Sequence, residues 1–286
     1  MMRRVLGGLT LRELARQAFE RAYKDNAFGR AAELAYYFLL ALFPMLIFLI
    51  SVFGRLRGLQ QELLTWLSRV MPSEAMGLVN DWVRDVADNS SRSLLSLGLF
   101  GSLWAASSGV GALIGALNTA YDVAEDRPYW KARLLAIGLT VALCIFLVGG
   151  TALIMFGDLF AERLAVRLGL GAAVAQSWRY VDYLLGMALL WAGIEAIYYL
   201  APNVKGRWQL VTPGALFAVF AFIFMSILFS RYLRIAPSYS ATYGSLGAVI
   251  VLMLWLYLLG LILFLGAEIN SVIERASGVT RARELA

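Results

Sequence analysis

The chain alternates between six long apolar segments and shorter connections that carry most of its charged residues. Each segment holds about 19 residues or more, and a helix rising 1.5 Å per residue then crosses a hydrocarbon core of about 30 Å. Because lipid offers the backbone no hydrogen-bond partners, such segments must be helices. The pattern predicts an all-α polytopic membrane protein, a single membrane domain over residues 1–286, with spans at about 34–54, 94–118, 134–157, 183–201, 214–233 and 246–269.

Amphipathic segments flank the first span. Residues 9–30 repeat apolar side chains at helical spacing, and Thr10 and Glu13 have the spacing of a capping box. We expect an interfacial helix here, and the charged residues ahead of the span are atypical of a cleaved signal peptide. Residues 59–88 predict two short amphipathic extracytoplasmic helices joined at Pro72. These helices either pack on the membrane surface or form a lid over an outer opening.

The composition leaves little equipment for catalysis. Hydrophobic residues make up 60% of the chain and charged residues 15%, there is no histidine, and Cys144 is the one cysteine. These counts exclude an internal disulfide and every catalytic triad or metal site that needs histidine. No phosphate-binding glycine motif opens a helix after a strand. We therefore expect no catalytic residues, no metal, no cofactor and no enzymatic activity.

The basic residues predict the orientation. On the side that holds both termini lie 15 of the 25 Lys and Arg residues, and the short connection 123–133 is dense in them. Because basic residues concentrate in cytoplasmic loops, both termini are expected in the cytoplasm. The net charge of +6 then reflects topology and attraction to anionic lipid headgroups. Membrane lipids are the expected partners, and nucleic acid is not.

Local signals add detail to three spans. Span 94–118 is rich in glycine, alanine and serine, which let helix backbones approach closely. It is expected at the packed centre, although a flexible gate is the alternative. Pro44 removes a backbone hydrogen bond and predicts a kink in the first span. Thr212 followed by Pro213 has the pattern of an N-cap and first helical residue.

Polar side chains inside the spans are candidates for function, since a charge at mid-bilayer costs about 2.5–3.5 kcal/mol. In the predicted orientation the carboxylates all fall in the cytoplasmic third. Three helices also place a carboxylate and a phenol on one stripe, because steps of three and four residues return to the same face. The candidate cavity-lining residues are Glu33, Tyr36, Tyr37, Pro44, Asn118, Asp122, Glu195, Tyr199, Tyr257, Glu268 and Asn270.

The alternative is that some of these charges only mark the membrane boundary. Glu33 and Glu268 lie near span ends, where a carboxylate meets the headgroups at low cost. Glu195 is deeper, roughly 9 Å from its span end at the helical rise, and predicts a buried, paired or cavity-lining carboxylate. The nearest cationic candidates are Lys131, Arg133, Lys205 and Arg207. A candidate outer mouth consists of Arg231, Arg234, Tyr239 and Tyr243.

Several segments together resemble one protein family. They are Ala31 to Tyr37 with Leu42-Phe-Pro44, Tyr198 to Asn203 with Thr212 to Ala215, and Tyr239 to Gly247 with Gly266 to Asn270. Their order is similar to that of the YihY / virulence factor BrkB family of bacterial inner-membrane proteins, with Ala41 where the family usually has a small hydroxyl residue. The resemblance implies an inner-membrane location and an envelope role linked to serum resistance and to lipid or lipopolysaccharide traffic. It also carries an older label, ribonuclease BN, which is generally considered mistaken.

Three hypotheses about function follow. The leading one is a transporter-like protein that handles a lipid or other amphiphile through a cavity among the six helices. The second is a non-transporting scaffold, a homo-oligomer or a subunit that joins other envelope proteins in a complex. The third, a membrane nuclease, is disfavoured because the chain has no histidine ligands and no basic groove interleaved with aromatic residues.

Overall fold

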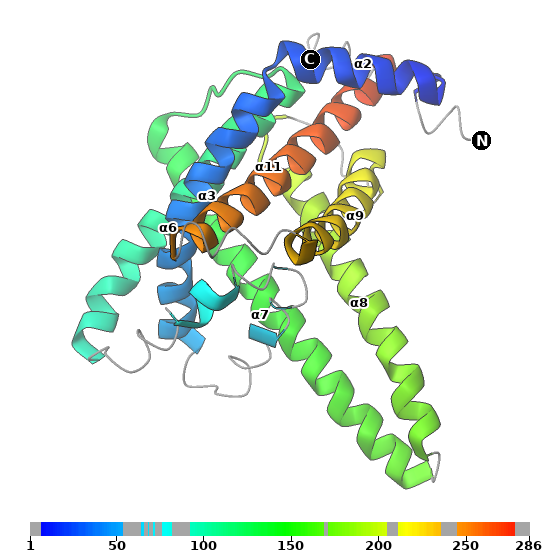
Figure 1. Ribbon diagram of the computed structural model, residues 1–286. Coiled ribbons are helices and arrows are strands. Elements are labelled where there is room, and N and C mark those ends of the chain that lie inside the picture. Colours follow the sequence, from blue (N-terminus) through cyan, green and yellow to red (C-terminus); the bar gives the residue numbers. More distant parts are fainter. Residues whose placement is uncertain are drawn as a thin grey trace.

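The helical membrane architecture is confirmed. The computed structural model describes residues 7–53, 64–65, 68, 71, 76–81, 92–168, 171–204, 211–235 and 245–277, and within these ranges the regular structure is helical throughout. Six of the helices in this part of the chain are long and apolar enough to span a membrane. The main helices, shown in Figure 1, are α2 (Leu11–Lys24), α3 (Ala27–Phe53), α6 (Arg92–Tyr121), α7 (Tyr129–Leu168), α8 (Gly171–Leu200), α9 (Pro213–Ile235) and α11 (Ser245–Ala276).

The helices are longer than the apolar segments that predicted them, because polar residues extend them past the hydrocarbon. The first span was expected to begin at 34, but α3 begins at Ala27. The N-terminal helix is shorter than its predicted range of 9–30 and ends at Lys24. Between the two, Asn26 has a φ of 53°, a left-handed conformation that breaks the helix and redirects the chain.

The α7–α8 hairpin shows the largest difference from the predicted boundaries. Spans of 134–157 and 183–201 were expected, whereas α7 has 40 residues and α8 has 30. At 1.5 Å per residue α7 is about 60 Å long, twice a hydrocarbon core of about 30 Å. Figure 1 shows the two helices extending together well beyond the other helices, at the end of the molecule opposite α2.

Two helices form the centre of the bundle. The span in α6 has the largest buried share, 44%, as its small residues predicted. Gly109 of α6 lies close against α3, because a Cβ there would be only 2.8 Å from the Cβ of Ala41. The second central helix, α11, packs against α2, α3, α6 and α9. A Cβ on Gly260 of α11 would likewise lie 3.0 Å from the Cβ of Leu34 on α3.

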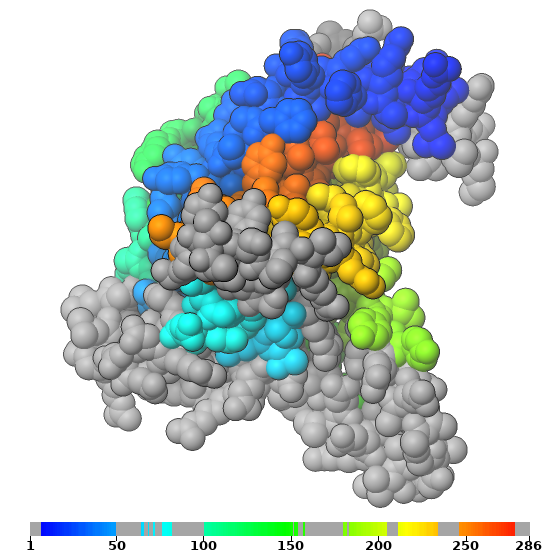
Figure 2. Space-filling model, viewed as in Figure 1, coloured from blue at the N-terminus to red at the C-terminus, as the bar shows by residue number. Residues whose placement is uncertain are grey.

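The N-terminal helix begins as predicted but is held by the bundle as well as by its amphipathic character. The Thr10 backbone N–H donates to Glu13 at 2.8 Å and the Glu13 N–H donates to the Thr10 hydroxyl at 3.3 Å, which completes the capping box. Leu14 and Ala18 are buried against Val272 of α11. In Figure 2, α2 (blue) lies across the end of the molecule over α11 (orange).

Described residues between the first two spans pack on the bundle. Met76 and Val79, in a short helical stretch over 76–81, are buried together with Leu46 of α3 and Leu252 of α11. This contact is with the helix bundle, and the choice between packing on the membrane surface and a lid over an outer opening stays a prediction. Most of that segment, including Pro72, lies outside the described residues.

Candidate functional site at the polar end of the bundle

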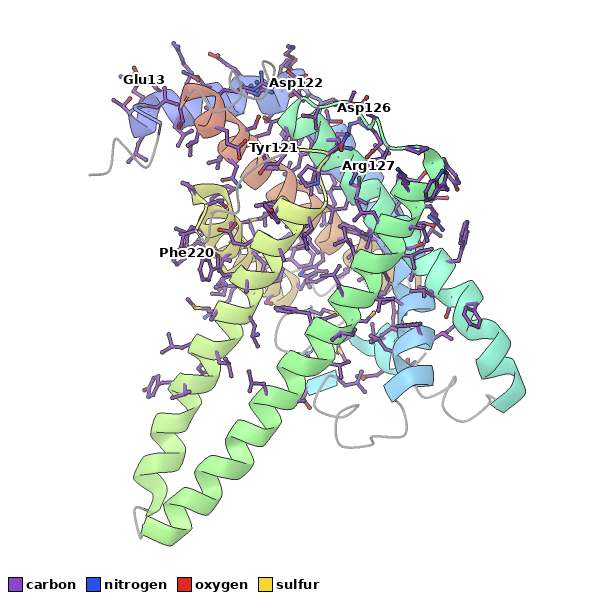
Figure 3. The ribbon with its side chains drawn as sticks, turned by 180° about the vertical axis from the view of Figure 1, so that it is seen from behind. Glu13, Tyr121, Asp122, Asp126, Arg127 and Phe220 are labelled. Carbon is purple, nitrogen blue, oxygen red and sulfur yellow. The ribbon has the colours of Figure 1, made fainter. Side chains whose placement is uncertain are left out.

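The polar residues of the spans gather at the end of the molecule that carries α2. This end is made by the last turns of α6, α8 and α11 and the first turns of α3 and α9. Side chains labelled in Figure 3, Asp122, Asp126 and Arg127, lie at this end. The sequence predicted one cluster, and the structure arranges the polar residues as separate networks that each join different helices.

The first network is built on Thr212, the residue before α9. Glu195 of α8, 5% exposed, accepts hydrogen bonds from the Thr212 backbone N–H and, at 3.0 Å, from the Thr212 hydroxyl. That hydroxyl in turn accepts from the Ala215 N–H at 3.3 Å, the N-cap bond that the sequence predicted. Asn270 of α11 donates to the same hydroxyl at 3.1 Å and accepts from the Gly214 N–H at 2.7 Å.

Glu195 therefore caps the N-terminus of α9, where the helix dipole stabilises a negative charge. The sequence had suggested a cationic partner for it. Instead, Lys131 lies over the Trp130 ring and Arg133 lies 4.1 Å from the centre of the Trp104 ring, while Lys205 and Arg207 lie outside the described residues. This buried carboxylate is satisfied by hydroxyl and amide donors, at a site that joins α8, α9 and α11.

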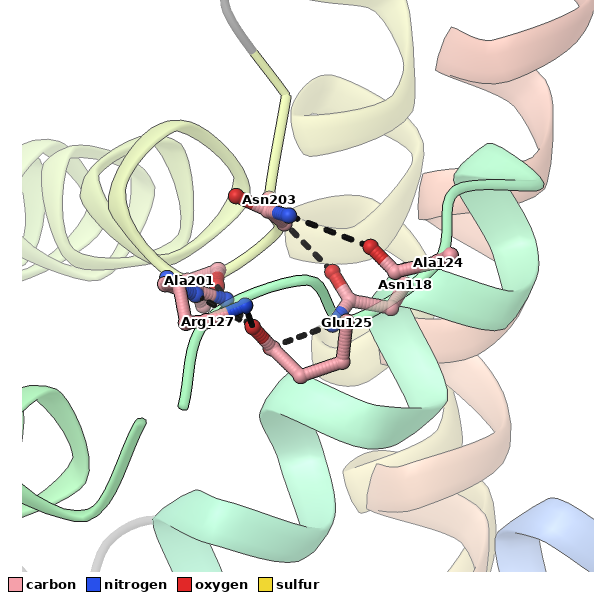
Figure 4. A network of polar contacts seen from close by, with 6 residues as sticks. All are labelled: Asn118, Ala124, Glu125, Arg127, Ala201 and Asn203. Carbon is pink, nitrogen blue, oxygen red and sulfur yellow. Dashed lines mark hydrogen bonds and ion pairs between the residues drawn. The ribbon is translucent and has the colours of Figure 1, made fainter. Parts of the chain in front are cut away.

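The second network joins α6 to the end of α8 (Figure 4). Asn118 donates to Glu125 at 2.8 Å and accepts from the Asn203 N–H at 2.7 Å. Arg127 makes two hydrogen bonds of 2.6 Å to the two oxygens of Glu125, and also donates to the Ala201 carbonyl at 3.2 Å. The connection between α6 and α7 is fastened to α8 by this network.

Two carboxyl groups outside the spans have lowered pKa values. The Arg127 hydrogen bond holds the pKa of Glu125 below its ordinary value of 4.5, against a smaller opposing effect of burial. The hydrogen bond from Arg275 likewise lowers the pKa of Asp122. Asp122 follows α6 with a φ of 55°, and its contact with Arg275, at 2.8 Å, joins the ends of α6 and α11. Both carboxylates are thus stabilised in the charged form.

The third network lies beneath α2. Glu268 of α11 has no exposed surface and accepts from Arg21 Nε at 3.2 Å. The Nη2 atom of the same guanidinium lies 3.8 Å from Asp25. One cation is thus shared by two carboxyl groups, and the second oxygen of Glu268 makes no hydrogen bond within the described residues. This ion pair holds α2 on the end of α11.

A tyrosine ties α8 directly to the α11 backbone. Tyr198 is 4% exposed and donates to the Leu263 carbonyl at 2.8 Å. Its ring fits over Gly266, which also contacts the backbone of Gly214 so closely that neither glycine has room for a Cβ. The sequence had selected the neighbouring Tyr199, which is 39% exposed and directed away from this contact. Helical phase thus pointed to the right turn of α8, but it did not tell which of the two adjacent tyrosines is buried.

Comparison with known proteins agrees with the earlier resemblance. The model of the virulence factor BrkB family matches residues 18–285. The chain belongs to this family. Among its relatives is YfkH of Bacillus subtilis, named as a ribonuclease-like protein, which is 36% identical over 260 residues and covers 91% of this chain and 94% of its own length. No solved structure matches the chain.

Other relatives of this BrkB-family chain are named UPF0761 membrane proteins. One from Rhodospirillum centenum is 26% identical over 291 residues, covering 98% of this chain, and this chain spans 62% of that relative's length. One from Pseudoalteromonas translucida is 23% identical over 272 residues, with 90% of this chain and 85% of the relative covered. The family and the six apolar helices together identify a membrane protein.

The remaining candidate residues are dispersed. Glu33 lies on the surface of α3 and pairs with Arg30 at 3.0 Å, so it does not join the buried carboxylates. Tyr36 and Arg231 are exposed, and Arg234 lies in the last turn of α9. The half-buried candidates are Tyr37, Pro44 and Tyr257. Tyr239 and Tyr243 lie outside the described residues. Their proposed roles at a cavity or an outer mouth stay predictions.

Sequence patterns did not identify three members of the polar networks, Arg21, Glu125 and Arg127. A signal was present for two of them, because Glu125 and Arg127 stand two residues apart just beyond the end of a span, where opposite charges pair readily. No comparable signal identified Arg21, which reaches Glu268 across 247 positions of sequence.

Proposed function

We propose that this protein handles a lipid or other amphiphile in the bacterial inner membrane, in the manner of a transporter, with both termini in the cytoplasm. The observation that carries the proposal is the contrast between the two ends of the bundle. At the end with α2, hydrogen bonds and ion pairs join the helices. Away from that end, α8 and α9 expose apolar side chains.

The exposed surface of α9 supports an amphiphilic ligand. Phe217, Phe220, Phe224 and Ile227 are all exposed and follow one another at steps of three and four residues, so they share one face. In Figure 3 the labelled Phe220 points outward from the bundle. Arg231, four residues after Ile227, is also exposed on this face. An apolar stripe that ends in a cation matches a molecule with acyl chains and an anionic head.

Low burial of α8 adds support. The span Tyr183–Leu200 is 17% buried, the smallest share among the six spans of the described residues. Its exposed side chains include Tyr183, Leu184 and Met187.

The experiment is reconstitution of the purified protein into liposomes that contain a fluorescent phospholipid. Movement of the label between leaflets is followed by adding a membrane-impermeant quencher. We expect faster movement than in protein-free liposomes, and slower movement for Arg231→Gln than for Arg12→Gln, which removes the same charge from α2. Rates equal to those of protein-free liposomes would contradict lipid handling.

A scaffold is the alternative outcome of the same preparation. It is supported if the protein moves no lipid but is isolated with a stable envelope partner or as a homo-oligomer. A nuclease remains disfavoured on the chemistry of the residues. Within the part of the chain that the structure describes, no three His, Cys, Asp or Glu side chains gather where they could hold a metal ion.

A further inference from the structure

A depression of about 540 Å³ lies where α2 meets the last turn of α11. Its walls come from three places in the sequence: the residues before α2, one flank of α2, and the end of α11. The residues that matter most for its chemistry are Gly7, Gly8, Gln17, Arg21, Val272 and Arg275. This depression lies beside the networks described above, and two of their arginines, Arg21 and Arg275, form part of its wall.

Among the residues that the structure describes, the charged groups that line the depression are two arginines. Arg21 and Arg275 stand far apart in sequence and are brought together because α2 packs on α11. The carboxylates that contact them, Asp25, Glu268 and Asp122, are absent from the lining and fix the guanidinium groups in place. Each guanidinium has five N–H donors. Within the described residues, these ion pairs engage two nitrogens of Arg21 and one of Arg275.

The glycine pair shapes the wall nearest the N-terminus. Gly7 and Gly8 have φ values of 63° and 89°, in the left-handed region that favours glycine. A Cβ on Gly7 would lie 2.8 Å from the Ile273 carbonyl oxygen and from the Ser277 hydroxyl, so only glycine lets this segment meet α11. A Cβ on Gly8 would meet open space. The backbone therefore closes the depression at one side without filling it.

We propose that this depression binds the phosphate of an anionic phospholipid headgroup. Guanidinium groups recognise phosphate oxygens through paired, charge-assisted hydrogen bonds, and two of them, Arg21 and Arg275, line this site. Leu11 and Phe19 are exposed on α2, which suits a helix at the membrane surface. The proposal stands independently of lipid movement, since a headgroup can be held here whether or not lipids are transported.

The test is native mass spectrometry of the full chain in detergent, titrated with phosphatidylglycerol, phosphatidylcholine or soluble glycerol phosphate. Two pairs of variants give matched charge changes. Gln17→Glu adds a negative charge in the depression, and Ala15→Glu adds one on an exposed position of α2 outside it. Arg275→Gln removes a lining charge, and Arg16→Gln removes an exposed one.

We expect phosphatidylglycerol to bind in preference to phosphatidylcholine. Arg275→Gln should weaken binding by about tenfold, the effect of losing one charge-assisted hydrogen bond. Gln17→Glu should weaken it by about the same factor, because its carboxylate would repel the phosphate. The matched variants should stay within about twofold, since exposed charges are screened. Gln17→Glu changes none of the residues that form the ion pairs, so its result stands even if Arg275→Gln folds poorly.

The soluble probe separates two sources of the phosphate. Competition by glycerol phosphate would support recognition of the phosphate group itself, whereas binding of phosphatidylglycerol without such competition would support a headgroup presented by the lipid. Equal effects of Gln17→Glu and Ala15→Glu, or equal binding of the two lipids, would overturn the proposal.

Discussion

Replacing Thr212 by valine should destabilise the whole polar end of the bundle, because one hydroxyl serves three helices. The substitution keeps the shape of the side chain and removes the donor to Glu195 and the acceptor for Asn270 and Ala215. A hydrogen bond to a charged group contributes about 1.5–3 kcal/mol, and each neutral one about 1 kcal/mol. Because the bonds share one oxygen and are partly buried, we expect a loss of about 3 kcal/mol in the free energy of unfolding.

That loss corresponds to a fall in Tm of roughly 6–12 °C, at the ratio of about 2–4 °C per kcal/mol that holds for domains of about 150–250 residues. The chain supplies its own probe, because Cys144 is its one cysteine and is 1% exposed. A thiol-reactive dye added to the protein in detergent should therefore become fluorescent only as the bundle unfolds. The Tm is read from the rise in fluorescence during heating.

Two variants control this measurement. Thr212→Ser keeps the hydroxyl and should remain close to the unmodified protein. Thr119→Val makes the same chemical change on α6, where the hydroxyl donates to the Gly115 carbonyl of its own helix at 3.1 Å, and should shift the Tm little. If Thr212→Val unfolds at the same temperature as Thr119→Val, the hydroxyl does not hold the three helices together and the reasoning is wrong.

Two further predictions follow from the same end of the molecule. Gly214→Ala should prevent stable folding, because the added Cβ would collide with the Gly266 backbone. Gly111→Ala is the control and should be tolerated, because a Cβ there meets open space. The two variants are compared by the yield of monodisperse protein on size-exclusion chromatography. The pKa of Glu125 is lower in the folded than in the unfolded chain, so its contribution to stability is complete above its ordinary value of 4.5 and is lost as the pH falls through the lowered value. The Tm of Glu125→Gln should therefore fall less between neutral and acidic pH than the Tm of the unmodified protein. Equal falls in Tm would contradict the role of the Arg127 contact.

Local patterns predicted the parts of this fold that depend on neighbouring residues. The six spans followed from hydropathy, because the bilayer requires long apolar helices. The capping box at Thr10 and Glu13 and the N-cap at Thr212 followed from spacing, since their donors and acceptors lie within one turn. Helix ends were less accurate, as at Ala27, because polar residues continue a helix after the apolar pattern stops.

The candidate site was predicted only in outline. Topology correctly brought Glu195, Glu268 and Asn270 to one end, but their partners depend on how the helices are rotated and how closely they approach. Tyr198 rather than Tyr199 faces α11 because Gly266 leaves room for its ring. A difference of one residue along a helix is a rotation of about 100°, which hydropathy alone does not resolve in a span that is apolar on all sides.

What the sequence determined by itself is thus a six-span helical membrane protein with its polar residues near one end, because the lipid environment acts on each segment separately. The tertiary structure decided which of those residues meet. Arg21 reaches Glu268, and Asn270 reaches Thr212, across hundreds or tens of positions of sequence. Such contacts depend on the packing of α2 and α9 against α11, and packing is a property of surfaces in three dimensions that no single segment contains.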